Sequence, residues 1–169
     1  MTHRMLAAAT NHPDPVNPYF GLFNARSISS LCNFDITIDV VAPRPYAPPI
    51  GPFSEYNQIP KVSTHNRYQV HHPRFFYGLP KRFFYSIAGQ SYAKRVGRFV
   101  EEQFDNHDIV HAYHLYPDGY GMLNYCEGHG LPLVAVAHGA ALNEFESFTL
   151  GVQSKILTTL GQCNKLLWV

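Results

Sequence analysis

The chain has 169 residues, of which 46% are hydrophobic and 15% are charged, a balance that excludes a disordered chain and is typical of one globular domain. Its formal net charge of +1 gives no overall electrostatic field that would attract nucleic acid, so we predict no nucleic-acid partner. The three cysteines (Cys32, Cys126 and Cys163) are widely spaced, which argues against a disulfide framework or a zinc site and favours buried thiols in a reducing cytoplasm.

The first half of the chain alternates strand-like and helix-like segments. The apolar run at residues 5–9 is too short for a signal sequence or a membrane span, and we predict a buried strand there. Residues 43–60 contain six prolines and are predicted to form an irregular loop. The other elements predicted in this half are a helix over 25–31, strands over 36–42 and 68–70, and a long helix over 81–104 with an interruption near Gly89.

The second half shows a clearer alternation of the same two kinds of segment. Residues 133–137 (LVAVA) form a continuous apolar run, which is typical of a strand covered on both faces. The sequence ends inside another buried-type strand, so we expect the chain to be a piece of a longer protein. The other elements predicted here are strands over 109–112 and 166–169 and helices over 120–126, before the stop signals Gly128 and Gly130, and over 152–160.

Alternating strands and helices of this kind predict an α/β fold, in which a mostly parallel sheet carries helices on both faces. Ligands of such sheets bind beyond the carboxyl ends of the strands. The segments that follow the predicted strands are 10–21, 113–121 and 138–143, and they hold much of the unusual polar and glycine content of the chain. We therefore predict that these three segments converge on one edge of the sheet.

The segment HAYHLYPDGYG (111–121) combines two imidazoles, a carboxylate and two glycines at the end of a strand. A metal site of His111, His114 and Asp118 is disfavoured, because the two histidines would point to opposite faces of an extended strand and no HExxH spacing is present. The structural alternative is a turn at 117–119 that opens a helix, with Asp118 accepting backbone N–H groups as its N-cap.

Two further positions follow strands. His138 comes directly after LVAVA and precedes Gly139, where an imidazole can exchange a proton with a ligand near neutral pH, or alternatively cap the strand against a neighbouring loop. Gly21 precedes the first predicted helix, where a glycine permits close approach of a phosphate to the helix N-terminus. No GxGxxG motif is present, which argues against a classical dinucleotide site.

The segment HHPRFFYGLPKRFFYSIAGQSYAKRVGR is both basic and aromatic. This combination suits a surface that contacts an anionic membrane, and the alternative is a core-facing aromatic stripe with solvated cations. Single-stranded nucleic acid also suits such a segment, but the near-neutral overall charge argues against it. The candidate membrane-surface residues are Arg74, Lys81, Arg82, Lys94, Arg95 and Arg98.

Taken in order, these segments resemble the N-terminal domain of family 4 retaining glycosyltransferases, whose GT-B fold consists of two facing Rossmann-like domains. The resembling segments are NPYFGLFNARSISSL, VVAPRPYAP, HHPRFFYGLP, DIVHAYHLYPDGYG, LPLVAVAHGAALN and the closing helix with LLWV, and together they cover nearly the whole chain. The family often has HAHW where this chain has HAYH, and HGSD where His138-Gly139 is followed here by Ala140 and Ala141.

The resemblance implies that residues 1–169 form the acceptor-side domain, and that a C-terminal domain outside this sequence holds a nucleotide-sugar donor. The whole enzyme would transfer a hexose, with retained configuration and without a metal or other cofactor, to a glycan or lipid-linked acceptor. It would lie in the cytoplasm, peripherally at the inner face of the cell membrane, and this chain alone would be inactive. The alternatives are a non-catalytic module that binds a glycan, a lipid or a protein, and a metal-dependent hydrolase, which would carry stoichiometric metal.

The same resemblance assigns candidate site residues. Gly21 would lie beside the donor diphosphate, and His114 and His138 would be catalytic. The residues expected to line the acceptor cleft are Tyr113, Asp118, Gly119, Gly139 and Asn143.

Overall fold

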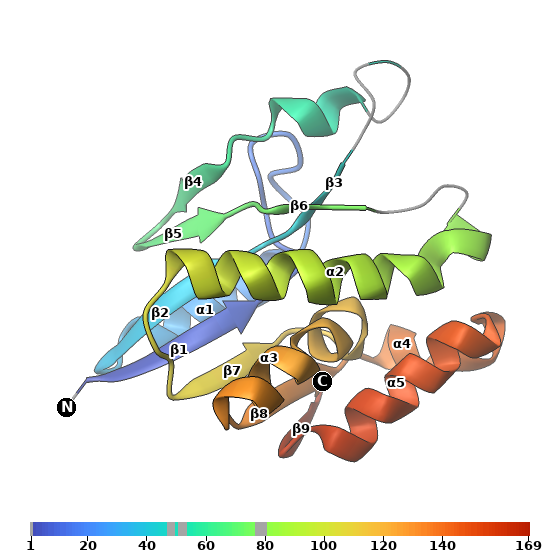
Figure 1. Cartoon of the computed structure of the whole chain (residues 1–169). Coiled ribbons are helices and arrows are strands. Elements are labelled where there is room, and N and C mark those ends of the chain that lie inside the picture. The colour runs from blue at the N-terminus through green and yellow to red at the C-terminus, as the bar shows by residue number, and fades with distance from the viewer. Residues whose placement is uncertain (1, 47–49, 51–53, 77–80) are drawn as a thin grey trace.

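A seven-stranded sheet runs through the molecule (Figure 1). The computed structural model describes residues 2–46, 50, 54–76 and 81–169, without the side chains at 81–84, 140 and 141. Within these ranges, neighbouring strands of the sheet are parallel except for the β4–β5 hairpin. The strands lie in the order β4 (Val62–His65), β5 (Tyr68–His71), β2 (Ile36–Val41), β1 (His3–Ala8), β7 (Ile109–Ala112), β8 (Leu133–Ala137) and β9 (Lys165–Trp168).

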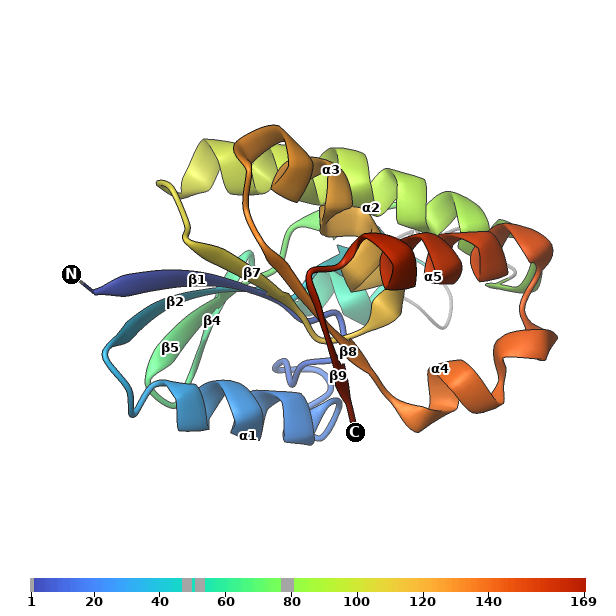
Figure 2. The same cartoon turned by 90° about the horizontal axis from the view of Figure 1, so that it is seen from below.

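Helices cover both faces of this sheet, as predicted (Figure 2). Helix α1 (Leu22–Leu31) lies on one face, and α2 (Lys81–Gln103), α3 (Tyr120–His129) and α5 (Leu150–Gln162) pack together on the other. The alternation of side chains along β1 explains the two cores. Leu6 and Ala8 are buried beneath α2 and α3, whereas Met5 and Ala7 are buried beneath α1. The fold is therefore α/β and Rossmann-like.

Helix α2 continues through Gly89, so the predicted interruption at this glycine is wrong. The glycine is present because another segment approaches it closely. Its backbone N–H donates a hydrogen bond of 2.8 Å to the hydroxyl of Tyr116, and a Cβ atom at this position would lie 2.4 Å from the Tyr116 ring. The same hydroxyl donates to the carbonyl oxygen of Tyr85. Gly89 thus permits contact between α2 and the loop after β7.

The proline-rich segment 43–60 is more regular than predicted. Its first described part contains β3 (Arg44–Pro45), which pairs in parallel with β6 (Arg74–Phe75), and a 3₁₀ turn follows at Ser54–Gln58. The strand predicted at 68–70 is present as β5, and its hairpin partner β4 was not predicted. Further short elements absent from the prediction are η2 (Leu115–Gly119), α4 (Gly139–Asn143) and η3 (Phe145–Ser147). Within the described residues, no helix combines the length and the apolar character needed to cross a bilayer.

Candidate functional site

The carboxyl ends of β1, β7 and β8 bring together the three segments that were predicted to converge. The chain leaves β1 for β2 on one side and passes to β7 on the other, so the topological switch point lies between β1 and β7. The loop after β1 contacts the loop after β7 through Thr10 and Asp118 and through Asn11 and His114. His138, after β8, contacts the backbone of Tyr113. The predicted convergence is therefore confirmed.

Asp118 is completely buried and holds the loop after β1 in place. Its two carboxylate oxygens lie 3.0 and 3.1 Å from the backbone nitrogen of Thr10, and it also accepts a hydrogen bond from the Thr10 hydroxyl. Helix α3 receives no side-chain capping bond at its N-terminus, so the prediction that Asp118 caps this helix is wrong. The carboxylate is turned toward β1 instead. Asp118 therefore joins two loops at the edge of the sheet, and its side chain is enclosed by the protein and not exposed at a cleft.

His114 is oriented by two neighbours. The side-chain amide nitrogen of Asn11 lies 3.0 Å from Nε2 of His114, and because an amide nitrogen can only donate, Nε2 is the acceptor. Nδ1 therefore carries a proton, and it faces Oδ2 of Asp118 at 3.4 Å. The ring is 17% exposed and lies 4.7 Å from the ring of His138, measured between centroids.

His138 presents the more available imidazole of the pair. Its Nε2 donates a hydrogen bond of 2.8 Å to the carbonyl oxygen of Tyr113, so Nδ1 is left with its lone pair. Partial burial, and secondarily the neighbouring His114, lower the pKa of His138. The ring of Phe23 packs edge-on against it at 4.8 Å. A neutral imidazole held in this way can accept a hydrogen bond or a proton from a ligand at neutral pH.

Tyr113 was expected to line the cleft, but its ring faces the core beneath α1 and is only 2% exposed. The hydroxyl lies 3.4 Å from Oγ of Ser27, the ring stacks on His111, and burial raises the pKa of Tyr113 to about 12. The signal for this orientation was present in the sequence, because strand alternation places Tyr113 on the same side of the sheet as Ile109. Its contribution to the edge is the carbonyl that holds His138.

The remaining candidates for the cleft differ in exposure. Gly119 is buried, and a Cβ there would lie 2.6 Å from Cγ2 of Thr159, so this glycine serves packing. Gly139 and Asn143 are exposed at the two ends of α4, beside His138. A Cβ on Gly139 would lie 3.7 Å from Nδ2 of Asn143, so the two positions are adjacent. Of the candidates for the cleft, Gly139 and Asn143 are therefore exposed, beside the partly buried His138.

Gly21 has a backbone role that does not depend on a ligand. It precedes α1 with φ +69 and ψ 30, in the left-handed region that favours glycine. A Cβ at this position would lie 2.2 Å from the carbonyl oxygen of Asn11, which also accepts a hydrogen bond of 2.7 Å from the side chain of Asn24. The contact with a donor diphosphate remains a prediction.

We expect Gly21→Ala to lower the free energy of unfolding by about 3 kcal/mol, because alanine adds backbone strain and a clash with a backbone carbonyl. The matched control is Gly128→Ala in α3, where an added Cβ meets no atom within 4 Å and helix propensity favours alanine. Urea-induced unfolding followed by circular dichroism measures both. Equal unfolding free energies for the two variants would contradict this interpretation.

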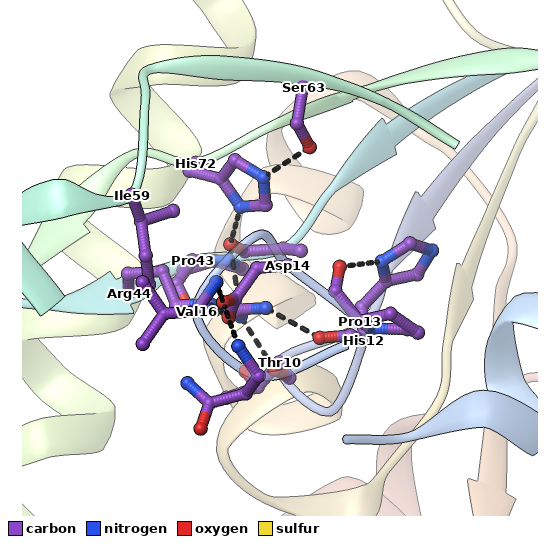
Figure 3. A network of polar contacts seen from close by, with 12 residues as sticks. Thr10, His12, Pro13, Asp14, Val16, Pro43, Arg44, Ile59, Ser63 and His72 are labelled. Carbon is purple, nitrogen blue, oxygen red and sulfur yellow. Dashed lines mark hydrogen bonds and ion pairs between the residues drawn. The ribbon is translucent and has the colours of Figure 1, made fainter. Parts of the chain in front are cut away.

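A buried ion pair behind the loop after β1 was not identified from the sequence (Figure 3). Nε of Arg44 donates to Oδ2 of Asp14 at 2.8 Å, and the two side chains are 3% and 1% exposed. The guanidinium also donates to the carbonyl oxygens of Thr10 at 2.8 Å and His12 at 2.6 Å. Asp14 comes from a proline-rich loop and Arg44 from the short strand β3 in a proline-rich segment, where no periodic pattern indicates which side chain is buried. This pair determines the path of the loop that carries Asn11 and Gly21.

Two neutral histidines flank the ion pair. Nδ1 of His72 donates to the carbonyl oxygen of Ala42, and its Nε2 is hydrogen-bonded to Oγ of Ser63. Nδ1 of His12 donates to the carbonyl oxygen of Pro13, and its Nε2 is hydrogen-bonded to the Tyr68 hydroxyl. Burial lowers the pKa of each histidine to about 4. Their hydrogen-bonding capacity is used within the fold, so they support the loop without adding charge.

All four predicted membrane-surface residues with described side chains gather around one cavity. Arg74 of β6 and Lys94, Arg95 and Arg98 of α2 line a cavity of about 620 Å³, together with Lys61, which was not predicted. The side chains of Lys81 and Arg82 lie outside what the structure describes. Among the aromatic residues of this segment, Phe75 and Tyr92 belong to the core, as the alternative interpretation predicted.

The residues considered for a metal site do not come together. The His111 ring stacks on Tyr113 at 4.4 Å, whereas His114 faces Asp118. Across the residues that the structure describes, no three His, Cys, Asp or Glu side chains are placed so that they could hold a metal ion.

Most of this chain matches a known protein family. The model of Glycosyltransferase Family 4 matches residues 25–163. One similar protein is the "Putative teichuronic acid biosynthesis glycosyltransferase TuaC" of Bacillus subtilis (strain 168), which is 20% identical over 171 residues. The alignment covers 98% of this chain but only 44% of that relative. The family match extends from α1 to the end of α5, and the chain therefore belongs to Glycosyltransferase Family 4.

Proposed function

We propose that this chain is the acceptor-side half of a glycosyltransferase that moves a hexose from a nucleotide-sugar donor to a glycan or a lipid-linked acceptor. Membership of the family supports the type of reaction. The chain spans 44% of the length of its relative, which leaves room in such a protein for a second domain of similar size that would hold the donor. In this proposal, the two domains form a GT-B fold and the transfer cleft lies between them.

The observation that carries the proposal is the neutral His138 at the exposed edge of the sheet. Nε2 of His138 is used in the hydrogen bond to the carbonyl of Tyr113, which leaves the lone pair on Nδ1 for a ligand. Gly139 and Asn143 lie beside this ring. In the proposed step, the bond between the anomeric carbon and the donor diphosphate breaks, and its electron pair leaves with the diphosphate. The acceptor oxygen bonds to the anomeric carbon on the same face, and the hydroxyl proton passes to His138 or to the departing diphosphate.

His114 has a different part in this proposal. Both of its nitrogens face protein groups, Nε2 toward the amide of Asn11 and Nδ1 toward Asp118. It is therefore a positioning residue, which fixes the place of the His138 ring beside it. Gly21 keeps the start of α1 close to the same edge, where helix N–H groups favour a phosphate. We propose that the N–H groups at this helix terminus stabilise the diphosphate, without a metal ion.

The test uses the longest in-frame polypeptide that contains this chain, with release of nucleoside diphosphate measured in the presence of a glycan or lipid-linked acceptor. We expect His138→Gln to lower kcat by about 100-fold or more, as the loss of a proton acceptor does. The matched control is His129→Gln at the end of α3, where the ring is hydrogen-bonded to the Tyr125 carbonyl and packs on the Tyr125 ring, and it should leave turnover unchanged. Wild-type turnover in His138→Gln would contradict the role of this residue.

Two further outcomes separate the proposal from its alternative, a non-catalytic module that binds a glycan, a lipid or a protein. A second Rossmann-like domain in frame after Val169 supports the half-enzyme, whereas a stop codon at that point supports the binding module. We expect the 169-residue chain alone to transfer no sugar, and transfer by it would contradict the need for a second domain. A lipid-linked acceptor would place the enzyme at the cytoplasmic face of the membrane, and this location is part of the proposal.

A further inference from the structure

A second feature of the molecule lies outside the edge of the sheet. We call it the basic groove, and define it by the five cations that line the 620 Å³ cavity: Lys61, Arg74, Lys94, Arg95 and Arg98. None of these residues belongs to the segments that form the candidate functional site. The volume is within the range of about 300–1,000 Å³ that small-molecule sites occupy.

Three separate segments build the basic groove. Lys94, Arg95 and Arg98 lie on the same side of α2, because Arg98 is three residues from Arg95 and four from Lys94, the spacings that make side chains neighbours on a helix. Strand β6 runs beside α2 and contributes Arg74, and Lys61 directly precedes β4 (Figure 1). The cations therefore face a common space, whereas on an isolated helix they would spread into solvent.

The basic groove contains more positively than negatively charged side chains. It holds five of the 13 lysines and arginines in a chain of net charge +1. One acidic side chain, Glu102, also lines it, and this carboxylate accepts a hydrogen bond of 2.7 Å from Arg98. Among the ion pairs of the described residues, none involves Lys61, Arg74, Lys94 or Arg95. Four cations thus line the groove without a carboxylate partner in the part of the chain that the structure describes.

Arg74 is the half-buried member of the set. Its Nη2 donates a hydrogen bond of 2.7 Å to the carbonyl oxygen of Ile59, whereas Nη1 is buried and has no hydrogen-bond partner among the described residues. A buried guanidinium nitrogen without an acceptor destabilises the folded state, and an anionic ligand would supply that acceptor. Pro73 and Phe99 add an apolar wall to the same cavity.

We propose that the basic groove binds a phosphate group, carried either by a soluble metabolite or by a lipid headgroup. A guanidinium group can donate two parallel hydrogen bonds to two oxygens of one phosphate, and the lysine ammonium adds a positive charge on a flexible side chain. The apolar wall of Pro73 and Phe99 suits the organic part of a phosphate ester. The groove does not share residues with the site of transfer, so this proposal does not depend on the proposed reaction.

The first arm of the test measures binding of inorganic pyrophosphate to the 169-residue chain by isothermal titration calorimetry. We expect saturable binding to the wild type. The double variant Lys94→Gln/Arg95→Gln should bind about tenfold more weakly, because it loses two charge-assisted hydrogen bonds to the phosphate. Both side chains are exposed, so this variant should fold. The matched control is Arg26→Gln/Arg67→Gln, which removes two positive charges at a separate polar depression and should bind within about twofold of the wild type.

The second arm identifies the source of the phosphate by co-sedimentation with vesicles of phosphatidylglycerol or of phosphatidylcholine. If the groove binds lipid headgroups, phosphatidylglycerol vesicles sediment the wild type and the Arg26→Gln/Arg67→Gln control, but not the Lys94→Gln/Arg95→Gln variant, and pyrophosphate displaces the protein. If the ligand is soluble, pyrophosphate binds and neither vesicle sediments the protein. The proposal is overturned if neither probe binds, or if the two double variants lose binding equally.

Discussion

Replacing Arg44 by methionine is expected to lower the free energy of unfolding by about 3–5 kcal/mol, as for the breaking of other buried ion pairs. The substitution leaves the carboxylate of Asp14 buried without a counter-charge, since both side chains are almost fully enclosed. It also removes the guanidinium N–H groups that donate to four backbone carbonyl oxygens (Figure 3). These carbonyls belong to Thr10, His12, Ala42 and Pro43. Urea-induced unfolding, followed by circular dichroism, measures the change.

A double-mutant cycle separates the ion pair from the other bonds of Arg44. Asp14→Asn removes the charge while its Oδ1 can still accept the backbone N–H groups of Val16 and Asn17, at 2.9 and 2.8 Å in the native protein. We expect Arg44→Met/Asp14→Asn to be more stable than the sum of the single variants predicts, by more than ~1 kcal/mol. Strictly additive effects would show that the pair contributes nothing beyond its separate hydrogen bonds.

Replacing Asp118 by alanine is expected to lower the free energy of unfolding by about 3 kcal/mol, because hydrogen bonds to a charged group contribute more than neutral ones and the Thr10 N–H loses its acceptor. The carboxylate accepts from both the backbone nitrogen and the hydroxyl of Thr10, and it is fully buried. In the longer polypeptide we also expect lower turnover, because His114 loses the carboxylate that faces its Nδ1.

Two companion variants define the cause of that loss. Thr10→Val removes only the hydroxyl bond and keeps the backbone N–H on Asp118, so it should destabilise by about 1 kcal/mol. Asp118→Asn keeps the shape and one carbonyl acceptor, and should fall between the wild type and the alanine variant. If Thr10→Val costs as much as Asp118→Ala, the backbone bond does not contribute, and our account of the loop is wrong.

The pattern of apolar segments was sufficient to predict the sheet and the edge at which the loops meet. Runs such as LVAVA at 133–137 identify strands that are covered on both faces, and parallel strands place their carboxyl ends together. The positions of His114 and His138 at that edge follow from chain order alone. The roles of these residues in a reaction stay predictions.

Side-chain partners across the fold could not be predicted in this way. Asp118 was expected to cap the helix that follows it, because local rules favour this role, but a backbone N–H from Thr10 competes successfully for the carboxylate. Arg44 lies in the two-residue strand β3 within a proline-rich segment, and no local pattern predicts that a charged residue there is buried. Both interactions join segments far apart in sequence, so only the assembled tertiary structure reveals them.

The bond between Thr10 and Asp118 has a mechanical consequence. It spans 108 positions of the chain and ties the loops on the two sides of the switch point to each other. Displacing one loop without the other would break hydrogen bonds to a buried carboxylate, which is energetically costly. The imidazole of His114 contacts both loops, through Asn11 in the loop after β1 and Asp118 in the loop after β7. We expect its position to change with theirs. We therefore expect the two loops to move together when a ligand binds at this edge.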